Sequence, residues 1–133
     1  MSHPPSKFLV VGIGASAGGV EALQTFFAHL PVASGCAYVV ILHLAPEYES
    51  NLAPILQAVT PLPVTVVTER VRVEPDHVYV VPPNQHLAMV DGALLVSPNT
   101  EPEDRRAPID IFFRTLAESH QSRGVCVVLS GSG

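Results

Sequence analysis

A glycine-rich stretch at residues 12–19 directly follows the apolar run 8–11, and no other feature limits the fold of this chain as strongly. The order predicts a short buried strand that enters a glycine turn and then a helix. Within the stretch, Gly14, Ser16 and Gly18 form the pattern G-x-S-x-G, which can hold a serine oxygen clear of a sheet beside the free N–H groups of a helix start. The same stretch also fits a phosphate-binding loop, so it is compatible with two different kinds of protein.

Apolar runs and breakers predict the remaining elements. The predicted strands cover residues 7–13, 36–42, 64–67 and 124–130, of which the first and the last are predicted to be buried. The predicted helices cover about 18–30, 50–59 and a stretch that begins at Pro108. The Asp91-Gly92 step between apolar segments predicts a small antiparallel ribbon around residues 77–96. Alternation of strands and helices implies right-handed parallel crossovers. The predicted fold class is therefore α/β, with a doubly wound, mainly parallel sheet.

Composition narrows the function. The 133 residues suffice for one domain, and 47% apolar with only 14% charged residues favours parallel strands that are buried on both faces. A formal net charge of −5 argues against nucleic-acid binding. No apolar run approaches the ~20 residues of a membrane span, and the start does not resemble a signal peptide, so we expect no membrane insertion and a cytoplasmic location. Histidines and cysteines lack zinc-site spacing, so we predict no metal. We also expect no cofactor.

The last predicted strand runs straight into a glycine turn at residues 131–133. Such a turn lies at the carboxyl edge of an α/β sheet, where ligands bind, and a helix is expected after it. We therefore interpret residues 1–7 as a disordered tail and residues 8–133 as the N-terminal part of a domain that is incomplete at its C-terminus.

The positions of one serine and one histidine predict nucleophilic catalysis. Ser16 follows the first strand and His43 ends the second, so both are expected at the same carboxyl edge on neighbouring strands. A serine nucleophile needs a base that accepts its proton. Taken singly, Ser16 also fits a helix cap and His43 a solvated loop residue. Together they are better explained as nucleophile and base.

The competing hypothesis is a dinucleotide site. Gly12, Gly14 and Ala17 satisfy G-x-G-x-x-A after a strand. This fingerprint expects an acidic residue at the end of the second strand, where it would hold the ribose. That position holds Leu42 and His43 instead, which weakens the nucleotide hypothesis without removing it.

Five motifs, in this order, resemble the catalytic domain of the CheB-type chemotaxis protein-glutamate methylesterases. They are residues 11–19, 43–44, 78–83, 106–113 and 127–133. The resemblance implies a serine hydrolase that removes methyl esters from glutamyl side chains of chemoreceptor helices, releases methanol and often deamidates receptor glutamines. Methylated chemoreceptors or similar sensory helices are thus the implied partners.

The resemblance also implies roles for individual residues. Ser16 matches the nucleophile and His43 the general base, while the backbone N–H groups of Ala17 and Ser132 are candidate oxyanion donors. The family's orienting aspartate would come about two residues after Gly133. Loss of such an acid lowers turnover by roughly 10⁴ in the worked serine-protease case. We therefore expect the 133-residue chain by itself to be very weakly active at best.

Two departures from the family pattern affect the expected context. The resemblance implies a phosphorylatable receiver domain ahead of the esterase in stand-alone members, whereas only seven residues precede the first strand here. The sequence of residues 108–114 is closer to members that are fused to a receptor methyltransferase, which we expect in the parent protein. Leu42 stands where the family commonly has Gln, so specificity would differ if this side chain touched substrate. The alternative function is a non-catalytic docking module with the same fold in a sensory hybrid protein.

Overall fold

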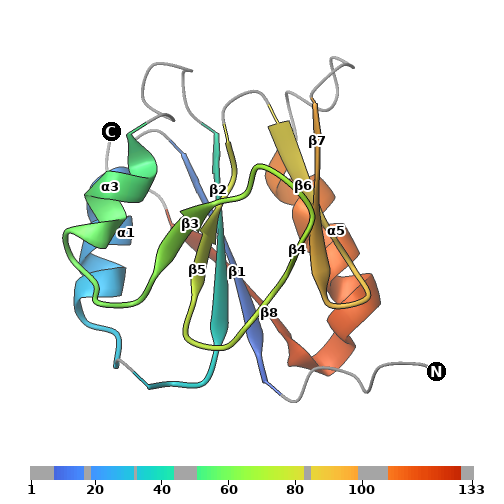
Figure 1. Cartoon of the computed structure of the whole chain (residues 1–133), viewed down its shortest axis with the longest axis horizontal. Helices are drawn as coiled ribbons and strands as arrows, with labels where there is room; N and C mark the ends of the chain where they lie inside the picture. Colours follow the sequence, from blue (N-terminus) through green and yellow to red (C-terminus); the bar gives the residue numbers. More distant parts are fainter. Residues whose placement is uncertain are drawn as a thin grey trace.

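A five-stranded parallel sheet forms the centre of the computed structural model, which describes residues 8–16, 19–31, 33–43, 51–82, 85–98 and 108–129 (Figure 1). The strands lie in the order β3-β5-β2-β1-β8. Their bounds are β1 (Val10–Ser16), β2 (Ala37–His43), β3 (Val64–Val66), β5 (Val78–Val80) and β8 (Gly124–Leu129). The second strand is therefore central and β1 is an inner strand between β2 and β8. The predicted α/β class with a mainly parallel sheet is confirmed.

Both faces of this sheet are covered, because the central strands are apolar on both sides. On one face lie α1 (Val20–Ala28) and α3 (Leu52–Gln57), which bury Leu23 and Leu56 in a cluster with Ile13. On the other face lies α5 (Pro108–His120), which buries Phe112 in a cluster with Ile41 (Figure 1). Full burial of one such side chain contributes about 1.5–3 kcal/mol, so the two clusters hold the helices on the sheet.

A small antiparallel sheet of three strands adjoins α5. Its strands, in spatial order, are β4 (Val71–Arg72), β7 (Ala93–Pro98) and β6 (Gln85–Val90). β6 and β7 are joined by the predicted Asp-Gly turn, where Asp91 and Gly92 both have positive φ, 52° and 79°. Two consecutive positive φ angles are typical of the tight turns that match strand twist.

The predicted bounds of this ribbon, residues 77–96, need a correction. β5 pairs in parallel with both β2 and β3 and belongs to the main sheet. All three of its residues are buried, as expected for a strand covered on both faces. The third strand of the small sheet is instead β4, whose two residues carry no periodic pattern. The helical segment η2 (Gln121–Arg123) connects α5 to β8.

The prediction that residues 124–130 form a buried strand is wrong about burial. β8 pairs only with β1 among the described strands, so it is an edge strand there. Val125 is 37% exposed and Val128 is 68% exposed. The apolar sequence predicted a strand correctly, but burial depends on neighbours that a local pattern does not specify.

Candidate active site

Ser16 and His43 occupy matching positions at the carboxyl ends of adjacent strands. β1 and β2 pair in parallel over their whole length, and Ser16 and His43 are the last pair of the register. Neighbouring strands lie about 4.8 Å apart, so the register brings the two backbones close together. The structure thus unites at one sheet edge the two residues that the sequence predicted there.

The first strand is longer than its sequence predicted. β1 continues through the glycine stretch to Ser16, rather than ending at residue 13. Gly12 and Gly14 therefore lie inside a strand, paired with Val39 and Ile41 of β2. The signal that could have shown this is the Gly-x-Gly alternation, because residues two apart share one face of a strand.

The glycines of β1 make room for α5. A Cβ atom at Gly12 would lie 2.9 Å from Cε2 of Phe112, and one at Gly14 would lie 2.6 Å from Cγ2 of Ile109. Both distances are shorter than real Cβ contacts, so the helix touches the strand backbone. This close packing accounts for two glycines that the dinucleotide hypothesis assigns to phosphate binding. That hypothesis also lacks its acidic residue, since His43 ends β2.

The first turn of α5 reaches the same end of the sheet. Pro108 begins the helix and is buried, and its missing N–H is one that a first turn leaves unpaired anyway. Asp110 lies in this turn and is exposed, where its charge interacts favourably with the positive end of the helix. Sequence reasoning predicted the start of α5, but not its contact with β1 through Ile109.

The start of α1 is also packed closely. A Cβ atom at Gly19 would lie 3.0 Å from both the Leu129 carbonyl oxygen of β8 and the Cβ of Ala15 in β1. The helix that follows Ser16 therefore begins directly against the carboxyl ends of β1 and β8. The two predicted oxyanion donors, Ala17 and Ser132, lie outside the described residues and stay predictions.

Leu42 lies in the core. It is 3% exposed and belongs to the cluster under α1 and α3. The idea that this residue changes specificity by touching substrate therefore has no support from its position. Its apolar side chain instead fills the layer between β2 and the two helices.

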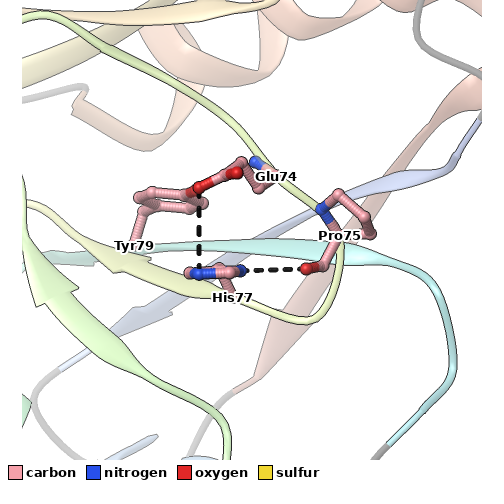
Figure 2. A network of polar contacts seen from close by, with 4 residues as sticks. All are labelled: Glu74, Pro75, His77 and Tyr79. Carbon is pink, nitrogen blue, oxygen red and sulfur yellow. Dashed lines mark hydrogen bonds and ion pairs between the residues drawn. The ribbon is translucent and has the colours of Figure 1, made fainter.

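A polar network occupies the opposite, amino end of the sheet. Figure 2 shows His77 beside the Pro75 carbonyl oxygen, which lies 2.9 Å from Nδ1, while Nε2 lies 3.9 Å from Oε2 of Glu74. The His77 ring stacks on Tyr79, whose hydroxyl accepts a hydrogen bond of 2.9 Å from the backbone N–H of Glu74. Burial raises the pKa of Tyr79 above its ordinary value of 10.0. This network stabilises the turn before β5.

Asp76 connects this turn to β2. It adopts a left-handed conformation (φ 60°), which Asp tolerates better than most residues. Its Oδ1 accepts a hydrogen bond of 2.9 Å from the N–H of Gly35, and its own N–H donates to the Cys36 carbonyl at 2.7 Å. Nearby, the hydroxyls of Tyr38 and Ser34 are 2.7 Å apart. Every polar group named here has a partner within the fold.

A second serine–histidine pair occurs near the end of α5. Oγ of Ser119 lies 2.8 Å from Nδ1 of His120. Burial, and secondarily the charge of Arg123, lowers the pKa of His120. These residues are consecutive in a helix, and they lie just before β8, at the amino end of the sheet. Ser119 is exposed, so this pair has no enclosed site beside it. It provides a matched control for Ser16.

Within the described ranges, no group of three or more His, Cys, Asp and Glu side chains could hold a metal ion. The same ranges contain no helix that is long and apolar enough to cross a membrane.

The fold and the paired strand ends can be compared with known proteins. The family model described as "CheB methylesterase" matches residues 11–133. A protein-glutamate methylesterase/protein-glutamine glutaminase of Myxococcus xanthus is 32% identical over 98% of this chain and 38% of its own length. Another protein of that name, from Xanthomonas oryzae, is 34% identical over 93% of this chain and 36% of its own length. The crystal structure of the Thermotoga maritima CheB methylesterase catalytic domain superposes with a TM-score of 0.79 and 25% identity.

These matches show that the domain has the α/β fold of a methylesterase catalytic domain. The Thermotoga comparison covers 96% of this chain and 70% of that one. The chain belongs to the CheB methylesterase family. It spans less than two fifths of the length of the Myxococcus and Xanthomonas relatives.

Proposed function

We propose that this chain carries the nucleophile and the general base of a protein-glutamate methylesterase. The observation that carries the proposal is the register of β1 and β2, which pairs Ser16 with His43 at their carboxyl ends. Family membership supports it, because relatives over the same span are named protein-glutamate methylesterase/protein-glutamine glutaminase. The proposed substrates are glutamyl methyl esters, and also glutamines, in the signalling helices of methylated chemoreceptors or similar sensory proteins.

The proposed reaction proceeds in two halves. Ser16 Oγ attacks the ester carbonyl carbon while His43 accepts the hydroxyl proton, and the backbone N–H groups of Ala17 and Ser132 stabilise the oxyanion. His43 then gives the proton to the leaving oxygen, so that methanol departs and an acyl-serine remains. Water, deprotonated by His43, hydrolyses this acyl-serine to a glutamate side chain. With glutamine as substrate, ammonia leaves in place of methanol.

The remaining expectations from the sequence belong to this proposal. The orienting aspartate is expected after Gly133, the fused methyltransferase in the parent protein and the enzyme itself in the cytoplasm. No cofactor enters the proposed reaction. Without the aspartate, the 133-residue chain is expected to turn over roughly 10⁴ times more slowly than a completed site.

A covalent probe tests the proposal even when turnover is slow. The chain is incubated with a fluorophosphonate, and mass spectrometry of peptides locates the phosphonylated residue. We expect labelling at Ser16, loss of labelling in Ser16→Ala and in His43→Gln, and no effect of Ser119→Ala, which removes the other serine that has a histidine partner. Methanol release from methylated receptor, measured beside it, should also require Ser16.

Two results would contradict the proposal. Equal labelling of Ser16→Ala and the unchanged chain would mean that Ser16 is not the nucleophile. Receptor binding by a chain whose Ser16 never reacts would favour the docking-module alternative.

A further inference from the structure

The packing of α5 on β1 differs between its two contact points. Gly14 faces Ile109 in the first turn of α5, where an added Cβ would lie 2.6 Å from Cγ2 and 3.0 Å from both Cγ1 and Cδ1. Gly12 faces the helix further along, with Phe112 Cε2 at 2.9 Å. Neither glycine leaves room for a Cβ atom, but only Gly14 lies close to the carboxyl end of β1.

The Gly14 contact lies one step below the Ser16–His43 pair on both strands. Gly14 is paired with Ile41, and two residues further along each strand the register pairs Ser16 with His43. At about 3.3 Å per residue, that step is about 7 Å along the strands. Ile41 and Ile109 pack in the same cluster, so α5 contacts both strands just below their ends.

We infer that the contact between Gly14 and Ile109 is a positioning contact for the Ser16–His43 pair, an inference that rests on the proposed function. A side chain at residue 14 cannot be accommodated by a shift of a flexible tip, because it meets three atoms of a β-branched side chain at once. Either the first turn of α5 moves outward or the end of β1 moves away from it. Attack on an ester requires atoms about 3–3.5 Å apart, so such a displacement slows the reaction.

The first glycine of the G-x-S-x-G pattern thus has a specific role in this chain. It sets the height of the first turn of α5 over the ends of β1 and β2, and Ile109 is the side chain through which it acts. Gly14 and Ile109 are positioning residues, because neither takes part in the proposed proton transfers.

Complementary substitutions separate positioning from ordinary packing. The variants are Gly14→Ala, Ile109→Ala and their combination, with Gly12→Ala as a control on the same strand face against the same helix. For each variant, thermal unfolding gives stability, and the fluorophosphonate labelling rate of the folded protein gives the reactivity of Ser16. In the double variant, the three crowding atoms of Ile109 are gone.

We expect Gly14→Ala to slow labelling on the order of 10-fold or more, since a misplacement of about 1 Å can cost roughly 10²-fold. Ile109→Ala should restore the rate in the double variant and should not repair the stability of Gly12→Ala. Gly12→Ala should lower the melting temperature while folded molecules keep the normal labelling rate.

If Gly14→Ala does not fold, Ile109→Ala and Phe113→Ala provide the comparison, since both side chains are half-buried on α5 but only Ile109 faces Gly14. We then expect slower labelling in Ile109→Ala alone. Equal rates in these two variants, equal losses in Gly12→Ala and Gly14→Ala, or a double variant without rescue would overturn the positioning role. Absence of Ser16 labelling in the unchanged chain would instead overturn the proposed function, and the positioning role with it.

Discussion

The two ends of the parallel sheet are built in opposite ways. At the amino end, Asp76, His77 and Tyr79 are held by hydrogen bonds and ring stacking around the turn that leads into β5. At the carboxyl end, strand register pairs Ser16 with His43, and the glycines of β1 let α5 pack directly on the strand below this pair. Under the proposed assignment of Ser16 and His43, the density of polar contacts does not by itself indicate the reactive end of the sheet. The polar side chains at the amino end stabilise the turn before β5.

The largest expected effect at the amino end follows from changing Asp76 to valine. Asp76→Val removes the acceptor for the Gly35 N–H and puts a β-branched residue at a φ of 60°. We expect a loss of about 2–3 kcal/mol in the free energy of unfolding, about 1–2 from the left-handed backbone and about 1 from the hydrogen bond. Urea unfolding at pH 7 measures it.

Asp76→Asn is the matched control, because asparagine tolerates the same backbone conformation and keeps the acceptor oxygen. The free energy of unfolding should fall less than half as much in Asp76→Asn as in Asp76→Val. The labelling rate of Ser16 in folded Asp76→Val should equal that of the unchanged chain. A slower rate would show that the two ends are coupled and would break the comparison.

A smaller effect is expected from Tyr79→Phe. The phenylalanine keeps the ring against His77 but leaves the Glu74 N–H without its acceptor. The expected cost is about 1 kcal/mol at pH 7 by urea unfolding. Tyr38→Phe, which removes the contact with Ser34, tests whether any hydroxyl at this end is equivalent. Equal losses would mean that the two hydroxyls are equivalent, and no loss in Tyr79→Phe would mean that the Glu74 N–H needs no acceptor from the protein.

The smallest effect concerns pH and His120. Burial and Arg123 hold the pKa of His120 below that of the unfolded chain, about 6.5. As pH falls through about 6.5, the unfolded state binds this proton more readily, so folding stability decreases. The free energy of unfolding of His120→Gln should therefore fall less between pH 7.5 and pH 5 than that of the unchanged chain. Urea unfolding at the two pH values measures this difference.

The Arg123 contribution can be tested separately. In Arg123→Gln, NMR titration of the His120 ring should show a pKa closer to the ordinary value, since one of the two causes has been removed. An unchanged titration would assign the whole shift to burial. His120 lies far along α5 from Ile109, so neither variant should alter Ser16 labelling.

Local sequence patterns predicted most of the elements but not how they associate. Continuous apolar runs and the Asp91-Gly92 step predicted four strands and one hairpin, because these signals depend on adjacent residues. The placement of β5 failed, since its three residues do not reveal whether their partner is parallel or antiparallel. β4 was missed because two residues show no periodicity.

The candidate site could be predicted because its signals also come from adjacent residues, whereas the packing around it could not. Ser16 and His43 each end an apolar run, so parallel pairing was enough to predict their common edge. The packing role of Gly14 depends on Ile109, which is distant in the sequence and meets it only after the chain has folded. A glycine pattern therefore predicted a turn where the structure has a strand.

The position of β1 between β2 and β8 has a consequence for synthesis of the chain. β2 emerges from the ribosome soon after β1, but β8 follows β1 by about 100 residues, which takes roughly 5–20 s at the usual rates of translation. Throughout that interval one edge of β1 is open to water and to other chains. The nascent protein is therefore most in need of chaperone protection before β8 has paired with β1.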